Sequence, residues 1–347
     1  MSAVFAPWQQ RAYDHAVAAL EAGRLGHALL FCGPQGMGKR AVAERLAQYL
    51  LCSQAGAGQP CGKCRNCSLY LSRSQREPLE QRPDKSLAHP QGHPAHPDAV
   101  FVGFAWRMTP SPARQLTQVV VDQVRVLSER LAKTPQYGNS LVAIVEPADA
   151  LNENAFNALL KTLEEPVPGR YLWLVTAQPA SLPATIRSRC QRLEFRLPPE
   201  HEALAWLQAS GHAPGPAAEA LKAARGHPGL ALEWLQHDGL ALRRTVETDL
   251  DRIEGGQAGV VETGQRWAAD EHAADRLAHA ADLALARASD AGLTDPARLH
   301  KLAAWFDAAN RARDLLRTTV RGDLLMADLL LAWREGVHPR AGTGDAG

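Results

Sequence analysis

The 347-residue sequence lacks a charge excess of either sign. Its 38 lysines and arginines are balanced by 37 aspartates and glutamates, which gives a formal net charge of +1. A protein that binds nucleic acid or an anionic membrane by itself usually carries an electrostatic field that draws in its partner, and a balanced chain has no such field. The composition therefore argues against a stand-alone, high-affinity DNA-binding protein.

Long hydrophobic runs are missing as well. The most apolar late stretch, LLMADLLLAW, is interrupted by Asp328 and is too short to span a bilayer. The N-terminal stretch, MSAVFAPWQQRAYDHAV, has no basic segment followed by an apolar one, as a signal peptide would. With 46% hydrophobic and 22% charged residues, the chain has the composition of a globular protein, and its length predicts two to three domains. We expect a cytoplasmic protein that does not interact with membranes.

Cysteine is scarce outside one short segment. Four of the six cysteines follow the spacing C-x8-C-x2-C-x2-C, and in a reducing cytosol such a cluster indicates metal binding rather than disulfides. Four thiolates close a tetrahedral zinc site and leave no position for a catalytic water, so we predict a structural zinc. An iron–sulfur cluster is the alternative, but its fourth cysteine is typically followed by proline, whereas Ser68 follows here. The predicted ligands are Cys52, Cys61, Cys64 and Cys67.

Strand-like and helix-like segments alternate in the first part of the chain. Buried strands are predicted at HALLFC, LVAIVEP and YLWLVTA. Helices are predicted at residues 39–51, VVVDQVRVLSERLA and NENAFNALLKTLEE. This alternation predicts an α/β domain with a parallel sheet.

The composition changes after about residue 197, and no strand-like run follows. We predict an α/β domain over residues 1–197, a small helical domain over 198–238, a second helical domain over 239–338, and a disordered tail over 339–347. Within the first domain, the His/Pro-rich stretch of about residues 72–97 is predicted to be a flexible insertion. Its three His-Pro dipeptides, at positions 89, 93 and 96, are predicted to lie in a solvated loop rather than to form a second metal site.

A glycine-rich turn follows the first predicted strand. The segment GPQGMGKR fits G-x-x-x-x-G-K, in which Gly33, Gly36, Gly38 and Lys39 would form a backbone cradle for phosphates at the start of a helix. The next position should be a Ser or Thr that binds Mg²⁺, but it is Arg40. A guanidinium has no lone pair for a cation and brings a positive charge to the metal position. Cys32, just before the turn, is interpreted as a small buried hydrophobe.

The second catalytic element of a phosphate-loop enzyme is also altered. In many such enzymes an apolar strand ends in an acid that holds Mg²⁺ and is followed by a glutamate that activates water. At the end of LVAIVEPAD, Glu146 stands at the acid position and Pro147, which cannot act as a base, at the glutamate position. We therefore predict a phosphate-loop fold that has lost hydrolysis. Asp149 is interpreted as a cap for the helix beginning near Asn152 rather than as a displaced acid.

A basic residue lies near the end of the predicted α/β domain. In QPASLPATIRSRCQRLEF, Arg189 stands between an expected short helix and another strand. An arginine at the edge of a nucleotide-binding domain can stabilise transition-state charge in a neighbouring subunit. The tripeptide Ser-Arg-Cys is also compatible with an ordinary surface arginine.

Four segments taken together resemble the bacterial clamp-loader subunits of the DNA polymerase III holoenzyme, which belong to the AAA+ superfamily. They are HALLFCGPQGMGKR, the four-cysteine module, NAFNALLKTLEEP and TIRSRC. The resemblance covers about residues 5–197. It implies an AAA+ domain with a zinc module, followed by a small helical lid, in which AARGHPGLALEWL is similar to the second-sensor region, and by a helical collar domain used for oligomerisation.

Within this family, the departures from the phosphate-loop motifs at Arg40 and Pro147 favour the delta-prime type over the ATP-hydrolysing gamma/tau motors. The motors carry G-K-T and an Asp-Glu pair, where this chain has Lys39-Arg40 and Glu146-Pro147. The resemblance implies that Arg189 acts as an arginine finger on the ATP site of an adjacent motor subunit. It also places Thr176 at or beside the first sensor position. For the phosphate loop we favour a vestigial site over one that binds ATP or ADP.

The implied partners are gamma/tau motor subunits and a delta subunit in a hetero-oligomer, which would contact the sliding clamp and primed DNA through the complex. The chain would then be a component of a DNA-directed DNA polymerase, a nucleotidyltransferase holoenzyme, without ATPase activity of its own. Lys161, Glu164 and Glu165 have the charges of a subunit interface, although a solvated helix face fits them equally. Two alternatives are an active ATPase motor, in which Glu146 or Asp149 holds Mg²⁺, and a zinc-containing nucleotide kinase.

Overall fold

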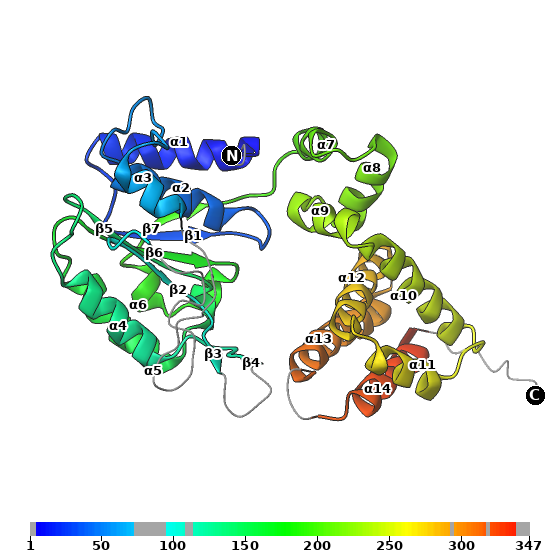
Figure 1. Cartoon of the computed structure of the whole chain (residues 1–347). Helices are drawn as coiled ribbons and strands as arrows, with labels where there is room; N and C mark the ends of the chain where they lie inside the picture. Colours follow the sequence, from blue (N-terminus) through cyan, green and yellow to red (C-terminus); the bar gives the residue numbers. More distant parts are fainter. Residues whose placement is uncertain (1–4, 73–94, 108–113, 292–294, 317–319, 338–347) are drawn as a thin grey trace, which may run out of the picture. The chain divides into compact units, whose positions relative to one another are not determined.

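A computed structural model gives the architecture of the chain, which divides into two compact units, residues 1–232 and 233–347 (Figure 1). Each unit is described by itself. The boundary falls inside one helix, α9 (Pro228–Gln236). The structure describes residues 5–72, 95–107, 114–291, 295–316 and 320–337.

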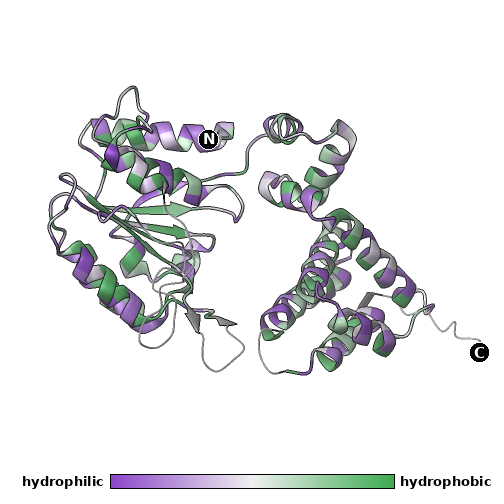
Figure 2. Ribbon diagram, in the orientation of Figure 1, coloured by the Kyte–Doolittle hydropathy of each residue, from purple (hydrophilic) through white to green (hydrophobic). Residues whose placement is uncertain are grey.

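A five-stranded parallel sheet forms the centre of the first unit. Its strand order is β2-β5-β6-β1-β7, so the first strand of the chain lies inside the sheet, between two strands that come much later. Parallel sheets are usually buried on both faces, and the inner strands β1 and β5 are accordingly hydrophobic and buried along their whole length (Figure 2). The strands are β1 (Ala28–Cys32), β2 (Ala99–Val102), β5 (Leu141–Val145), β6 (Arg170–Thr176) and β7 (Gln191–Glu194).

Successive residues of the inner strands belong to two separate cores, one on each face of the sheet. Leu29 and Phe31 of β1 pack with the core that includes α1 and α2, whereas Leu30 and Cys32 pack with the core that includes α4 and α5. Figure 1 shows α1, α2 and α3 on one face and α4, α5 and α6 on the other. The helices are α1 (Pro7–Glu21), α2 (Lys39–Leu51), α3 (Arg65–Leu71), α4 (Val121–Leu131), α5 (Glu153–Glu164) and α6 (Ala184–Arg187).

Short elements complete the first unit. Two 3₁₀ turns, η1 (Ala148–Ala150) and η2 (Pro179–Ser181), follow β5 and β6, where the parallel strands end. Strands β3 (Trp106–Arg107) and β4 (Arg114–Gln115) form a separate antiparallel pair. Two further helices, α7 (Glu200–Ala209) and α8 (Pro214–Ala223), precede α9.

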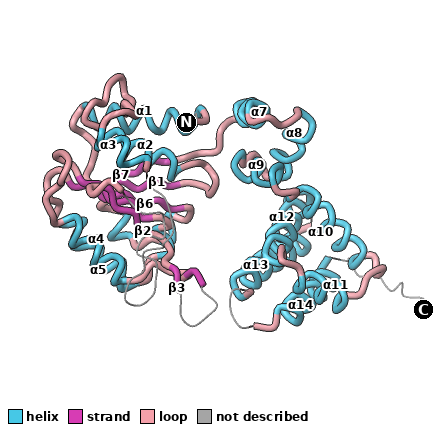
Figure 3. Tube along the Cα trace, in the orientation of Figure 1, coloured by secondary structure: helices cyan, strands magenta, loops and turns pink. Residues whose placement is uncertain are grey.

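The second unit consists of helices joined by loops in the part that the structure describes (Figure 3). Its core gathers Trp267, Trp305 and Trp333, and the rings of the last two lie 4.8 Å apart in an edge-on arrangement. Asp249 is buried and accepts hydrogen bonds from Trp267 Nε1 and Arg266, each 2.8 Å long. The helices are α10 (Gly239–Glu254), α11 (Val260–Ala269), α12 (Ala273–Ala291), α13 (Pro296–Leu315) and α14 (Gly322–Val337).

The predicted fold class is confirmed. The helix predicted at 39–51 coincides with α2, and the three predicted buried strands are β1, β5 and β6. The division into three domains at residues 197 and 238 stays a prediction. Most of the predicted flexible insertion (73–94) and the predicted disordered tail lie outside the described residues. None of the described helices is long and apolar enough to cross a membrane.

One prediction about the insertion is wrong. His96 does not lie in a solvated loop, because only 1% of its surface is exposed and its Nδ1 accepts a hydrogen bond of 3.1 Å from the backbone N–H of Asp98. Asp98 is itself buried and accepts backbone hydrogen bonds from Gln136 and Tyr137. The last His-Pro pair therefore belongs to the packed entry into β2. The other two pairs lie outside the described residues.

Candidate functional site

The glycine-rich loop connects β1 to α2 at the edge of the sheet where the parallel strands end. Gly33 and Gly38 have φ values of +141° and +77°, which L side chains rarely adopt. A Cβ at Gly33 would lie 2.2 Å from the carbonyl oxygen of Phe195, and one at Gly38 would lie 2.0 Å from Nε2 of Gln9. At Gly33 the loop therefore runs close to the backbone of Phe195, and at Gly38 close to the side chain of Gln9.

Lys39 is turned towards its own loop. Its Nζ donates hydrogen bonds of 2.7 Å and 2.6 Å to the carbonyl oxygens of Gly33 and Pro34. Burial lowers the pKa of the Lys39 ammonium, and the nearby carboxylates of Glu146 and Asp149 partly offset this effect. In a working phosphate loop this ammonium reaches the terminal phosphates. Here the backbone carbonyl oxygens of the loop accept its hydrogen bonds instead of phosphate oxygens.

Arg40 joins the start of α2 to the end of β5. Its Nε lies 2.7 Å from the carboxylate of Glu44, one turn along the same helix, and its Nη1 lies 3.2 Å from the carboxylate of Glu146. Burial raises the pKa of Glu146, and Arg40 lowers it again in part. Arg40 and Glu146, which the sequence analysis placed at the metal-binding hydroxyl and acid positions of the motif, therefore form an ion pair with each other.

Residues that the sequence analysis did not select also contact the loop. The carbonyl oxygen of Met37 accepts hydrogen bonds from Trp8 Nε1 (3.2 Å) and Gln9 Nε2 (3.3 Å) of α1. On the opposite side, α9 begins against the loop: a Cβ at Gly229 would lie 2.1 Å from the carbonyl oxygen of Gly36. His227 also packs on Gly36, and burial lowers the pKa of its imidazole.

Thr176 lies at the end of β6, beside the loop, and is buried. Its Oγ1 donates a hydrogen bond of 2.5 Å to Asp149 Oδ1, which also accepts one of 3.2 Å from the backbone N–H of Ala177. The predicted sensor hydroxyl is therefore bound to a carboxylate of its own chain. The prediction that Asp149 caps the following helix is wrong, because the cap of α5 is Asn152, whose Oδ1 accepts from the N–H of Ala155.

Arg189 follows the short helix α6 and precedes β7, as expected. Its two neighbours in the fold, Ile186 and Cys190, are buried in the core beneath α5, and burial raises the pKa of the Cys190 thiol to about 11. The Arg189 side chain is 37% exposed, and its Nη2 lies 2.7 Å from the carboxylate of Glu164. The backbone at this position is therefore anchored while the guanidinium reaches the surface.

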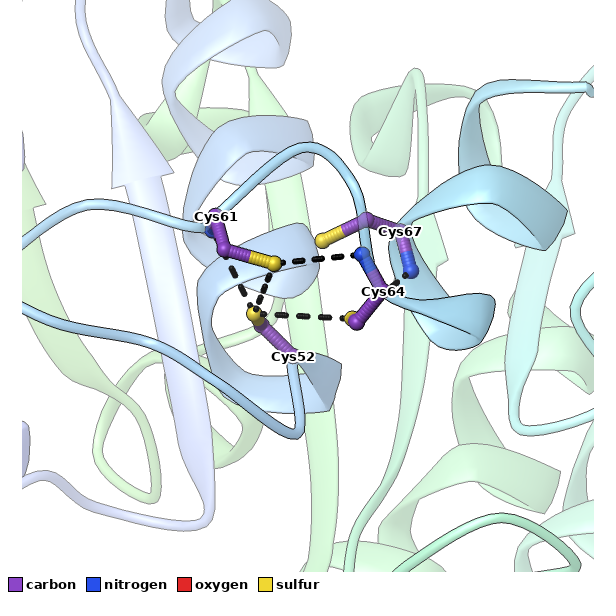
Figure 4. A group of neighbouring side chains, drawn as sticks. All are labelled: Cys52, Cys61, Cys64 and Cys67. Atoms are coloured by element: carbon purple, nitrogen blue, oxygen red, sulfur yellow. Dashed lines mark hydrogen bonds between the residues drawn. The ribbon is translucent and has the colours of Figure 1, made fainter.

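The four predicted zinc ligands come together in one group (Figure 4). Their sulfur atoms all lie within 4.8 Å of one another, and two pairs that involve Cys52 are separated by 3.5 Å and 3.8 Å. A tetrahedron with zinc–sulfur bonds of about 2.3 Å has sulfur atoms about 3.8 Å apart, so the donor set fits this ion. Backbone N–H groups of Cys61, Cys64 and Cys67 point at cysteine sulfurs at 3.3–3.4 Å, an arrangement that favours thiolates.

The cysteine group is also tied to the α/β core. Asn66, on α3 between two of the ligands, donates from Nδ2 to the carbonyl oxygens of Leu51 (2.7 Å) and Tyr137 (3.0 Å). Arg65 lies over the ring of Tyr137, 4.7 Å from its centroid, and donates to its hydroxyl. A metal held by the cysteines would therefore fix α3 and, through it, the loop before β5.

Comparison with known proteins gives a consistent family assignment. Residues 8–199 match the family described as DNA polymerase III, delta subunit. A DNA polymerase III subunit delta' from Escherichia coli strain K12 is 34% identical over 241 residues, which cover 69% of this chain and 64% of that protein. The chain thus matches less than two thirds of the length of this relative.

A protein named gamma/tau is also similar over a shorter stretch. A DNA polymerase III subunit gamma/tau from Mycobacterium tuberculosis strain H37Rv is 34% identical over 181 residues, which cover 52% of this chain and 26% of that protein. Among solved structures, a gamma subunit-related protein from Thermotoga maritima aligns with a TM-score of 0.47 at 15% identity, covering 93% of this chain and 100% of that one. Because the family match covers more than half of the chain and the relative matched over the greater length is named delta', this chain belongs to the DNA polymerase III delta-prime subunit family.

Proposed function

We propose that this chain is a delta-prime subunit of a DNA polymerase III clamp loader. In this role it acts with gamma/tau motor subunits and a delta subunit to load the sliding clamp onto primed DNA, and it does not hydrolyse ATP itself. The chain then contributes to a DNA-directed DNA polymerase holoenzyme as an assembly component. A near-neutral subunit suits this role, because the DNA contacts are shared among the members of the complex.

The Arg40–Glu146 ion pair is the observation that carries the proposal. Phosphoryl transfer to water needs Mg²⁺ between the phosphates and the protein. A metal ion at this point would meet the guanidinium, and like charges in a half-buried site repel strongly. Pro147 offers no base to activate the water.

The other polar groups of the loop support the same conclusion. Lys39 is bonded to the carbonyls of Gly33 and Pro34, and Thr176 to Asp149. A nucleotide would have to break these contacts before it gained any of its own, so its affinity is reduced by their combined free energy. We assign the loop a structural role as the junction of α1, α2 and α9.

Arg189 is the residue that we assign to chemistry. It is anchored on both sides by buried residues and presents its guanidinium at the surface. Planar guanidinium groups bind phosphate oxygens through two N–H groups, and an arginine supplied in trans stabilises the charge of the transition state. We propose that Arg189 acts on ATP bound by a neighbouring motor subunit.

We further propose that Cys52, Cys61, Cys64 and Cys67 hold one zinc ion. Zinc with four thiolate ligands supplies a fixed tetrahedral centre and has no open position for catalysis. The role assigned to the module is to fix α3 on the core through Asn66. For the helical parts, α7–α9 would form the lid, at about residues 198–238, and α10–α14 the collar, at about 239–338.

An assay of ATP hydrolysis tests the proposal. The purified chain should show no steady-state turnover above the buffer control, while the gamma/tau subunit of the same organism, measured in parallel, should hydrolyse ATP. Mixed with that motor and the delta subunit, the chain should enter one complex that loads the clamp onto primed DNA. Turnover of the isolated chain at the rate of the motor would overturn the proposal in favour of an active ATPase, the function that the similarity to gamma/tau proteins suggests.

A further inference from the structure

Two acidic residues stand at the end of α5 where a helix disfavours them. Glu164 is the last residue of the helix, and Glu165 occupies the C-cap position. The C-terminus of a helix carries a partial negative charge from its unpaired carbonyls, so a carboxylate there is unfavourable by about 0.3–1 kcal/mol. The electrostatics of the helix end therefore do not explain why either position carries a glutamate.

Among the described residues, Glu164 has an ion-pair partner. The Glu164 carboxylate lies 2.7 Å from Nη2 of Arg189, which is 25 positions later in the chain. On its other side, Nη1 of Arg189 donates a hydrogen bond of 2.9 Å to the carbonyl oxygen of Thr185 in α6. The guanidinium is thus held by two different elements through two different nitrogens, while 37% of the side chain stays exposed.

We infer that Glu164 is a positioning residue for Arg189. The inference rests on the proposed function, because it assumes that Arg189 acts on a phosphate in a neighbouring subunit. Glu164 restricts the rotamers of the arginine and keeps the unbonded N–H groups of its guanidinium directed outwards. The carboxylate touches no nucleotide and does not replace any group of the motor site.

The strength of the contact suits this task. Glu164 is 50% exposed, and exposed ion pairs contribute little to stability. Such a pair reduces the freedom of the side chain but can be rearranged when a phosphate, which binds guanidinium more strongly, comes within reach. A long, rotamer-rich arginine that is already ordered loses less entropy when it engages its target.

The same argument predicts which step is affected. The affinity of the motor for ATP depends on the motor's own loop, so a change at Glu164 should leave the KM for ATP unchanged. The rate of hydrolysis at the site that Arg189 serves should fall about threefold to tenfold, the order expected when one orienting contact is lost.

The experiment uses the reconstituted clamp loader with this chain as wild type, Glu164→Gln, Glu165→Gln, Arg189→Ala and the double variant Glu164→Gln/Arg189→Ala. Glutamine keeps the size of the side chain and removes only the charge. Glu165→Gln is the matched control, because it removes the same charge from the next position of the same helix end. DNA-stimulated ATP hydrolysis is measured as a function of ATP concentration, and assembly of each variant complex is checked by gel filtration.

We expect Glu164→Gln to remove at least about half of the turnover that Arg189→Ala removes, at unchanged KM, and Glu165→Gln to behave as wild type. In the double variant, Glu164→Gln should add nothing to Arg189→Ala, because an orienting residue has no effect once the group that it orients is gone. Glu164→Asp keeps the charge on a shorter side chain and should restore part of the rate.

Three results would overturn the inference. One is wild-type or faster turnover of Glu164→Gln. Another is an equal loss from Glu164→Gln in the presence and in the absence of Arg189. The third is an equal loss from Glu165→Gln, which would indicate a general effect of charge at the helix end. A normal rate for Arg189→Ala itself would instead overturn the proposed finger, so the two failures are distinguishable.

Discussion

The guanidinium of Arg40 lies 3.2 Å from the carboxylate of Glu146, and the two residues occupy the positions at which the sequence motif predicts the metal-binding groups of a phosphate-loop enzyme. One residue comes from the start of α2 and the other from the end of β5, so the pair links two elements that surround the loop. The positive charge that Arg40 brings to this position is thus balanced by the carboxylate of Glu146. Under the proposed function, this pair stabilises the loop and no metal ion binds there.

Removing Arg40 should destabilise this part of the fold. In Arg40→Ala the half-buried carboxylate of Glu146 loses the guanidinium that pairs with it, and we expect a loss of about 1–3 kcal/mol. Hydrogen exchange of the α2 and β5 amides measures this loss locally, independently of the second unit. Unchanged protection in both elements would contradict the expectation.

The effect of Arg40→Ala should depend on pH. Burial already raises the pKa of Glu146, and without Arg40 it would rise further. When the folded-state pKa of an acid lies above its unfolded value, the folded state binds more protons, and stability is lost as the pH rises through this window. The destabilisation should therefore be smallest near about pH 4 and largest near about pH 8. Arg40→Ala/Glu146→Gln lacks the Glu146 carboxylate and keeps only that of Glu44, so the part of the pH dependence that comes from Glu146 should disappear.

Arg189→Ala should leave assembly intact and lower function. At the ATP site that Arg189 serves, the loss of a finger is expected to slow hydrolysis by about 10³-fold or more, which also reduces clamp loading. Arg189→Lys keeps the charge but not the planar fork, so it should restore little. Arg192→Ala, a change of another exposed arginine nearby on β7, is the control and should be without effect. A normal rate of DNA-stimulated hydrolysis in the Arg189→Ala complex would show that the finger is wrongly assigned.

The four-cysteine module should contain about one zinc ion per chain in freshly prepared protein. In Cys64→Ser the metal should be lost, and the amides of α3 should exchange faster because its N-terminus is no longer fixed. Faster exchange should extend to Tyr137, which Asn66 connects to α3. Cys32→Ala changes a buried cysteine of β1 outside the module and should keep the zinc. Metal analysis that finds no zinc in the unaltered protein would refute the assignment.

Much of this architecture can be predicted from the sequence because the signals are local. The helix at 39–51 follows from a glycine-rich turn and a run of apolar residues at helical spacing, and the helix in the structure has these bounds. The four cysteines are close in the chain, so their spacing alone predicts that they meet. Arg40 and Pro147 could be recognised because each occupies a defined position in a motif.

The closing contacts of the loop could not be predicted in this way. The loop contacts Trp8 and Gln9, near the start of the first unit in the sequence, and Gly229, near its end. No spacing rule predicts contacts between segments so far apart in the chain. Hydrophobic periodicity shows that a helix is amphipathic, but it does not show which loop the first residues of that helix contact.

Side-chain roles within a turn were similarly hard to predict. Asp149 and Asn152 are both good capping residues, and only the position of Thr176 on the neighbouring strand decides that Asp149 turns inwards. The burial of His96 depends on Tyr137, whose ring lies 5.8 Å from that of His96. This contact joins segments that are distant in the sequence, while the His-Pro composition around it is typical of a loop.

The contact between the loop and α9 gives the last prediction. In Gly229→Ala the new Cβ would lie 2.1 Å from the carbonyl oxygen of Gly36, so one of the two backbones must move. We expect a loss of about 1–3 kcal/mol, as for an overpacked core, with faster hydrogen exchange in the loop and in α9. Gly138→Ala is the control, because Gly138 is exposed, a Cβ there has nothing within 4 Å in the described structure, and the substitution should change the stability by less than about 0.5 kcal/mol. If both substitutions had the same effect, the close approach of α9 to the loop would not exist in solution, and the loop would be open to a ligand on that side.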